Sequence, residues 1–216
     1  DVVITSLDAG NETNGTAVYI QGSTNYAAGG TVLDRMGGTY GVELRQAGAV
    51  ELRHLIIQNA SQGIRIYSAN DCVVEWVRVI GGEQSFVVAN SDGAIFRHCV
   101  ARNASSRGLY ITQSGATWEN GILWSNGTYG VSLGGGTANI SNSVIGVFGS
   151  GSYAFGLGSG DAVVSDYNDI FLSDGAYASI QTAPSPAPFN IIHQNVSRWV
   201  RATGNDTHSL SHDPGF

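Results

Sequence analysis

Lysine is absent from this sequence, and all ten basic residues are arginines. Charged residues make up 12% of the chain, against about 25% in ordinary soluble domains. The formal net charge is −7, and the arginines are scattered rather than clustered. Binding to nucleic acid requires basic groups that neutralise phosphates, so we expect no nucleic-acid partner.

Long hydrophobic runs are also missing. No stretch approaches the ~18 consecutive apolar residues of a membrane-spanning helix, so we expect no membrane insertion. Runs of strong helix formers such as Ala, Leu, Glu and Gln are scarce, which argues against a helical protein. The chain is instead rich in turn-forming residues, with 30 glycines and many Ser, Thr and Asn residues. This composition is typical of many short strands separated by tight turns.

A repeat of 22 to 24 residues runs along the chain. In successive copies, a short apolar segment ends at Leu44, Ile66, Val88, Ile111, Leu133 and Leu157. A second apolar row keeps step with it at Leu52, Val74, Phe96, Trp118, Ile140 and Val164. Within a copy, apolar residues occupy alternate positions, as at Val42 and Leu44, which is the periodicity of a β-strand. A short repeat that contains only strands predicts a solenoid of stacked coils.

A third row in the repeat is mostly polar and lies two residues after the second apolar row, where the strand should turn. Its members are His54, Trp76, His98, Asn120, Asn142 and Asp166. Asn and Asp tolerate turn backbones, so we interpret this row as a structural turn ladder. His54 and His98 should be about 10 Å apart, too far to share a zinc ion, whose ligands lie about 2 Å from the metal. We therefore expect neither a metal site nor another cofactor.

The two cysteines can also be placed on the repeat. One 22-residue coil before Cys99 is position 77, five residues beyond Cys72. Five strand residues span roughly 16 Å, whereas a disulfide requires Cα atoms within about 7 Å. We therefore expect no bond between Cys72 and Cys99.

The pattern of rows resembles the right-handed parallel β-helix proteins of the pectate-lyase-like superfamily, including their turn ladder, over residues 16–173. The end of the chain is similar to a subgroup of secreted bacterial β-helix proteins. There, a coil like SDYNDIF (165–171) precedes a segment like W-x-x-x-TG-x-D-x-HS-x-S-x-DPGF, here 199–216. The resemblance implies an all-β fold, a right-handed parallel β-helix of about eight coils over residues 1–175. It also implies an irregular cap segment at 176–216, packed on the last coils, and a secreted or cell-surface location.

Enzymes of this superfamily usually work on the outer face of one parallel sheet. The outward residues beside the first apolar row that could bind a substrate are Glu43, Arg45, Arg65, Tyr67 and Tyr110. Arginine forks and aromatic faces suit acidic sugar chains. The alternative is an ordinary solvated sheet face with a cross-strand Glu–Arg pair. Toward the C-terminus this face becomes rich in glycine, which would allow the tail or another molecule to approach closely.

Two hypotheses for function stay open. The first is an extracellular β-helix module with a structural, adhesive or filament-forming role, which contacts polysaccharide or self-associates through open β-helix ends. The second is a polysaccharide lyase, glycoside hydrolase or epimerase acting on acidic glycans. No catalytic residue can be assigned, because Asn70, Asp71 and Asp92 offer too few oxygens for calcium and no pair of suitably spaced carboxylates is evident. Whether the chain is an enzyme is therefore undecided by its sequence.

Overall fold

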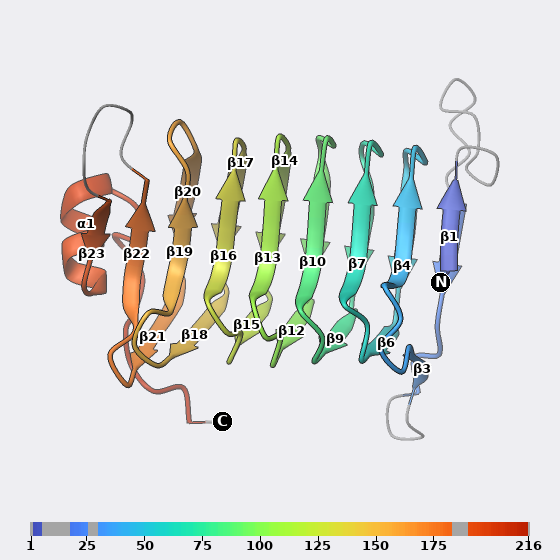
Figure 1. The fold of residues 1–216 in the computed structure, drawn as a ribbon, viewed down its shortest axis with the longest axis horizontal. Coiled ribbons are helices and arrows are strands. Elements are labelled where there is room, and N and C mark those ends of the chain that lie inside the picture. The colour runs from blue at the N-terminus through green and yellow to red at the C-terminus, as the bar shows by residue number, and fades with distance from the viewer. Residues whose placement is uncertain (1, 6–17, 26–29, 183–189, 216) are drawn as a thin grey trace.

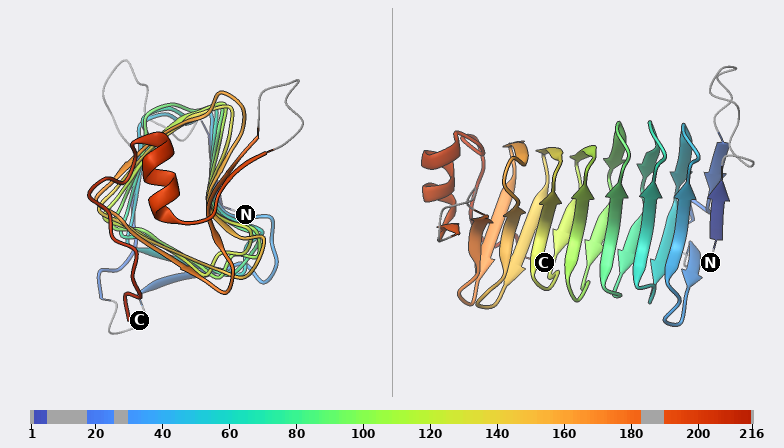
Figure 2. Two further views of the ribbon diagram at one scale, coloured as in Figure 1. Left: turned by 90° about the vertical axis from the view of Figure 1, so that its left-hand side faces the viewer. Right: turned by 45° about the horizontal axis from the view of Figure 1, so that its top comes forward.

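The computed structural model describes residues 2–5, 18–25, 30–182 and 190–215. They form a rod of three sheets that run side by side along its length (Figures 1 and 2). Sheet A consists of β1 (Val2–Thr5), β4 (Tyr40–Arg45), β7 (Gln62–Tyr67), β10 (Gln84–Ala89), β13 (Arg107–Thr112), β16 (Tyr129–Gly134), β19 (Tyr153–Leu157), β22 (Tyr177–Gln181) and β23 (Ile191–His193).

The other two sheets have seven strands each. Sheet B consists of β2 (Val18–Gln21), β5 (Val50–Arg53), β8 (Val73–Glu75), β11 (Ala94–Arg97), β14 (Gly115–Glu119), β17 (Thr137–Ser141) and β20 (Ala162–Asp166). Sheet C consists of β3 (Thr31–Asp34), β6 (Leu55–Gln58), β9 (Arg78–Ile80), β12 (Val100–Arg102), β15 (Ile122–Trp124), β18 (Val144–Phe148) and β21 (Asp169–Ser173). The helix, α1, spans Val196–Thr203. Within the described part of the chain, no helix is long and apolar enough to cross a membrane.

Each coil adds one strand to sheet A, then to sheet B, then to sheet C. Seven complete coils run from β1 to β21, and β22 starts an eighth. At the N-terminal end, β1 pairs with β4 at Val2 and Val42, as β2 pairs with β5 and β3 with β6. These three strands therefore form one coil, and the parallel β-helix predicted from the repeat is confirmed.

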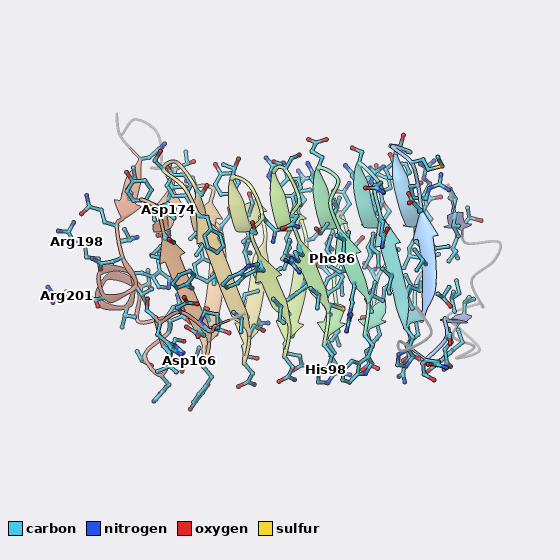
Figure 3. All side chains as sticks on the ribbon, turned by 90° about the horizontal axis from the view of Figure 1, so that it is seen from below. Phe86, His98, Asp166, Asp174, Arg198 and Arg201 are labelled. Atoms are coloured by element: carbon cyan, nitrogen blue, oxygen red, sulfur yellow. The ribbon has the colours of Figure 1, made fainter. Side chains whose placement is uncertain are left out.

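The first apolar row is an in-register ladder inside the rod. Leu44 pairs with Ile66, Ile66 with Val88, and Val88 with Ile111, and all four side chains are fully buried. Because each inward residue packs on the like residue of the next coil, the burial of apolar surface holds the coils in this register. Figure 3 shows Phe86 inside the rod and His98 at its rim.

The prediction of the second apolar row is confirmed as far as Ile140, but it is wrong for its last member, Val164. Ile140 pairs with Ser165, while Val164 pairs with Asn139 and is 66% exposed. The cause is an insertion: Ser132 pairs with Gly156, 24 residues later, whereas in the next sheet the offset becomes 25. One extra residue has entered the turn before β20, and it moves the residues of β20 and β21 by one position.

The turn between sheets B and C is a single residue in the left-handed conformation. The residues at this turn have φ between 50° and 59°; they are His54, Trp76, His98, Asn120, Asn142 and Tyr167. Asp166, which we placed in this ladder, instead pairs with Ser141 at the end of β20. The same one-residue insertion explains this error, because it moves Tyr167 into the turn.

The C-terminal segment closes one end of the rod. β22 extends sheet A beyond the expected boundary at residue 175, and β23 adds to it in the antiparallel direction. α1 follows, with Asn195 as its N-cap and Gly204 in the left-handed conformation as its C-cap. The ring of Trp199 stacks on Phe155 at 5.1 Å, and α1 lies across the end of the coils (Figure 2, left). The segment that we expected to be an irregular cap therefore contains regular structure, namely β22, β23 and α1.

Candidate ligand-binding face

The outer side of sheet A, which faces the reader in Figure 1, carries three rows of side chains across the coils. One row consists of Tyr40, Gln62, Gln84, Arg107, Tyr129, Tyr153 and Tyr177. The next consists of Glu43, Arg65, Val87, Tyr110, Ser132 and Gly156. The third consists of Arg45, Tyr67, Ala89, Thr112 and Gly134.

Four of the five predicted substrate-binding residues form one cluster. The carboxylate of Glu43 is almost fully buried and accepts hydrogen bonds from Arg45 Nη2 at 2.8 Å and from Arg65 Nη1 at 3.0 Å. Arg65 also donates to the hydroxyl of Tyr40 at 2.6 Å and lies over the ring of Tyr67 at 4.6 Å. Two guanidinium groups face one carboxylate, so the cluster keeps a net positive charge. The Glu–Arg pair of the alternative interpretation is thus present, with a second arginine added.

Tyr110, the fifth predicted residue, lies further along the rod beside a third arginine. The guanidinium of Arg107 lies 4.5 Å from the centroid of the Tyr110 ring and 5.9 Å from that of Tyr129. Its Nε is buried without a hydrogen-bond partner. Cation–π contact with two rings stabilises the charge, but the N–H group stays unsatisfied. The side chain as a whole is partly exposed, and no carboxylate of a described residue pairs with it, so Arg107 is the strongest candidate on this face for a contact with an anionic ligand.

A stack of tyrosines continues the face toward the C-terminal end. The rings of Tyr129 and Tyr153 are 5.7 Å apart, and those of Tyr153 and Tyr177 are 5.4 Å apart. Sequence reasoning missed these rings and Arg107, because they stand one position outside the alternating segment used to assign the face. The signal was available: each of these four residues comes immediately before a small residue at the start of a sheet A strand.

The glycines of this face accommodate the tyrosine rings. A Cβ atom at Gly156 would collide with the ring of Tyr129, and one at Gly134 would lie 3.3 Å from the hydroxyl of Tyr110. We expected the tail or another molecule to approach these glycines; tyrosine side chains occupy the space at Gly156 and Gly134, and α1 of the tail lies at the end of the rod.

The predicted turn ladder lies at a different corner of the rod, between sheets B and C. There the ring of Trp76 stacks on His98 at 4.2 Å and on His54 at 6.4 Å. Trp76 is 46% exposed. Among the described residues, no three His, Cys, Asp or Glu side chains gather as a metal site would require.

Stacked coils whose strands pair in parallel in three sheets define the chain as a parallel β-helix protein. A model of the right-handed β-helix region family matches residues 7–145, and the chain belongs to this family. Among solved structures, it is similar to the catalytic domain of a GH87 α-1,3-glucanase in complex with tetrasaccharides. The TM-score is 0.50 and the identity 13%, over 89% of this chain and 48% of that one. The chain thus spans about half of that domain, and the likeness shows the fold alone. No curated protein matches.

Proposed function

We propose that this chain is an extracellular β-helix module that binds an acidic polysaccharide along the outer side of sheet A. The observation that supports it most is the partly exposed Arg107, which lies between Tyr110 and Tyr129 and pairs with no carboxylate of the described residues. A carboxylate of the ligand would pair with the terminal N–H groups of this guanidinium, since guanidinium groups bind carboxylates through parallel N–H donors.

The remaining features of the face support a chain rather than a single sugar. The positive Glu43–Arg45–Arg65 cluster lies on the second and third coils, and the tyrosine stack reaches Tyr177 on the eighth. Aromatic rings present apolar faces on which sugar rings can stack. A polymer lying along the rod would contact several of these groups at once, and each added contact raises the effective affinity.

The arrangement favours binding over catalysis. Glu43 is the acidic member of the three outward rows, and two arginines engage its carboxylate. Hydrolysis of a glycosidic bond usually uses two carboxyl groups on either side of that bond, which this face does not bring together among its described residues. The alternative hypothesis, a lyase, hydrolase or epimerase, is tested in the same experiment, because an enzyme would alter the polymer that it binds.

The test is affinity electrophoresis of the whole chain in gels containing polygalacturonate or alginate, with dextran as the neutral control. Arg107→Gln should weaken binding to the acidic polymers by roughly tenfold or more, because a charge-assisted hydrogen bond is lost. Arg201→Gln, on α1 at the end of the rod (Figure 3), is the matched control and should bind normally. Equal binding by Arg107→Gln, or equal retention by dextran, would contradict the proposal. Shortened polymer after incubation would favour the enzyme hypothesis.

Self-association is a second proposal, and one observation favours it. β1 is the last strand of sheet A at the N-terminal end, and no described strand pairs with its outer edge. An unpaired strand edge invites addition of another chain. Light scattering after size exclusion should then show sizes that grow with concentration, whereas a constant monomer mass would contradict it. The extracellular location also stays a proposal, and fractionation of the producing cells would test it.

A further inference from the structure

The outer side of sheet C carries apolar and basic side chains along five neighbouring strands. One outward row consists of Ile56, Arg78, Val100, Ile122 and Val144. The second consists of Gln58, Ile80, Arg102, Trp124 and Gly146. These positions include two arginines and no acidic residue, so this surface is apolar with a positive charge.

Two adjoining cavities lie on this surface. One has a volume of about 290 Å³ and is lined by Val100, Arg102, Ile122 and Trp124. The other, of about 280 Å³, shares Val100 and Ile122 and reaches Trp76 beside Arg78. Because they share these two residues, they form one groove across β12 and β15. We call it the sheet C groove; its apolar floor has a tryptophan at each end.

The tryptophan at the Arg102 end is held firmly. The ring of Trp124 stacks on Phe171 at 5.8 Å, with 8° between the ring planes, and meets the edge of Phe148 at 5.1 Å. A side chain at Gly146 would collide with the Trp124 ring, so that ring lies flat over the next coil. Preorganised aromatic surfaces bind ligands at a low entropic cost. Trp124 therefore provides a rigid stacking wall.

Arg102 supplies a charge that the fold leaves uncompensated. Its side chain is exposed and has no hydrogen bond or ion pair with the residues that the structure describes. A ligand in the groove would therefore meet an available guanidinium beside an aromatic wall.

We propose that the sheet C groove binds a short anionic oligosaccharide, independently of the face on sheet A. Sugar rings would stack on Trp124 and lie against Val100 and Ile122, while a carboxylate or sulfate pairs with Arg102. This inference does not rest on the function proposed above, because the two surfaces belong to different sheets and share no residue.

Other occupants fit the groove less well. The backbone groups of β12 and β15 are used in the parallel ladders with their neighbours, so a peptide would find few main-chain partners. A second copy of the chain would need more surface. Five strands of three residues cover about 20 Å by 10 Å, or roughly 200 Å², against ~800 Å² per partner in a stable complex.

Tryptophan fluorescence can report on this groove alone. The chain has four tryptophans; Trp118 and Trp199 are buried, whereas Trp76 and Trp124 line the groove. The outward rows of sheet A contain tyrosine instead. Trigalacturonate should therefore protect the tryptophans of the full chain from quenching by acrylamide, and neutral maltotriose should protect them less.

Variants within the groove and variants elsewhere on the rod test whether the groove binds the oligosaccharide. Arg102→Gln and Trp124→Phe should each weaken trigalacturonate binding by roughly tenfold; the phenylalanine keeps the contacts with Phe148 and Phe171, so folding is retained. Arg107→Gln and Arg201→Gln should leave this protection unchanged. Unaltered protection in Arg102→Gln and Trp124→Phe would overturn the proposal, as would equal protection by maltotriose or by hexaglutamate. Because Arg107 belongs to the sheet A face alone, its variant tests the sheet A proposal without affecting the groove, so failure of one proposal can be told from failure of the other.

Discussion

The indole Nε1 of Trp199 donates a hydrogen bond of 2.9 Å to Oδ2 of Asp206, and both residues are buried. The other carboxylate oxygen accepts bonds from Ser165 Oγ at 2.9 Å, from Asn168 Nδ2 at 3.0 Å and from Ser209 Oγ at 2.7 Å. One carboxylate thus ties α1 and the following segment to the last coil. The motif recognised at the end of the sequence is therefore a structural clamp for the cap.

Removing this carboxylate should destabilise the protein strongly. Asp206→Ala leaves several buried donors unsatisfied and should cost roughly 3 kcal/mol or more, which lowers the melting temperature by about 6–12 °C in a chain of this size. Trp199→Phe keeps a ring on Phe155 and loses one bond, so about 1.5–3 kcal/mol is expected. Thermal melts by circular dichroism measure both. Equal, small losses for the two variants would contradict the clamp.

The repeat made the coils predictable from the sequence, because every coil buries like residues at the same positions. The ladder from Leu44 to Leu133 follows from alternation and spacing alone. The prediction failed at Val164 because an extra residue shifts β20 by one position and the inward position then holds a serine, Ser165. Ser165 is buried and satisfied by Asp206, 41 residues later. Alternation of apolar residues cannot reveal a polar core position whose partner comes from a distant segment.

The candidate sites were less predictable, for two physical reasons. The Tyr129–Tyr177 stack projects outward from strand residues that precede the alternating segment, so counting every second residue overlooks it. The groove residues Val100 and Ile122 are apolar and look like core residues in the sequence. Only the three-sheet geometry shows that they face outward.

A histidine in the cap should make stability depend on pH. His193 is nearly buried, its Nδ1 lies 2.7 Å from the Ser179 hydroxyl, and burial lowers its pKa from the ordinary value of 6.5. Above that value both the folded and the unfolded forms are neutral. As the pH falls below it, the unfolded chain gains a proton that the folded one resists, and stability is lost.

Melting temperatures measured from about pH 8 to about pH 5 should therefore decline, and His193→Asn should flatten the decline. The asparagine retains an acceptor for Ser179 without a titrating ring. His54→Asn, in a turn that suits asparagine, is the control and should keep the slope of the parent protein. A slope that persists in His193→Asn would assign the effect to another group.

Both cysteines should be inert in the folded protein. Cys72 and Cys99 are free and buried, and burial raises the pKa of the Cys99 thiol from 9.0 to about 12. The thiolate is the reactive form, so its population at a given pH falls about a thousandfold. Iodoacetamide should label neither residue under native conditions and both after unfolding in guanidinium. Rapid native labelling of Cys99 would show that the core opens locally.

Gly156 should control the order of the tyrosine face. In Gly156→Ala the new methyl group would occupy the position of the Tyr129 ring, so the ring must turn away from the sheet. The side chain is at the surface and can move, so the fold and melting temperature should change little. However, the stacking of the Tyr129 ring on Tyr153 and its contact with Arg107 would be lost.

Gly134→Ala is the graded control for this variant, since its methyl group would lie 3.3 Å from the terminal hydroxyl of Tyr110. A small shift of that side chain relieves the contact. In affinity electrophoresis, Gly156→Ala should therefore lose much of the binding to acidic polymer, and Gly134→Ala only a little. If Gly156→Ala binds as the parent does while the Tyr129 ring is displaced, the polymer does not lie on the tyrosine row, and the positive cluster around Glu43 or the sheet C groove would have to bind it.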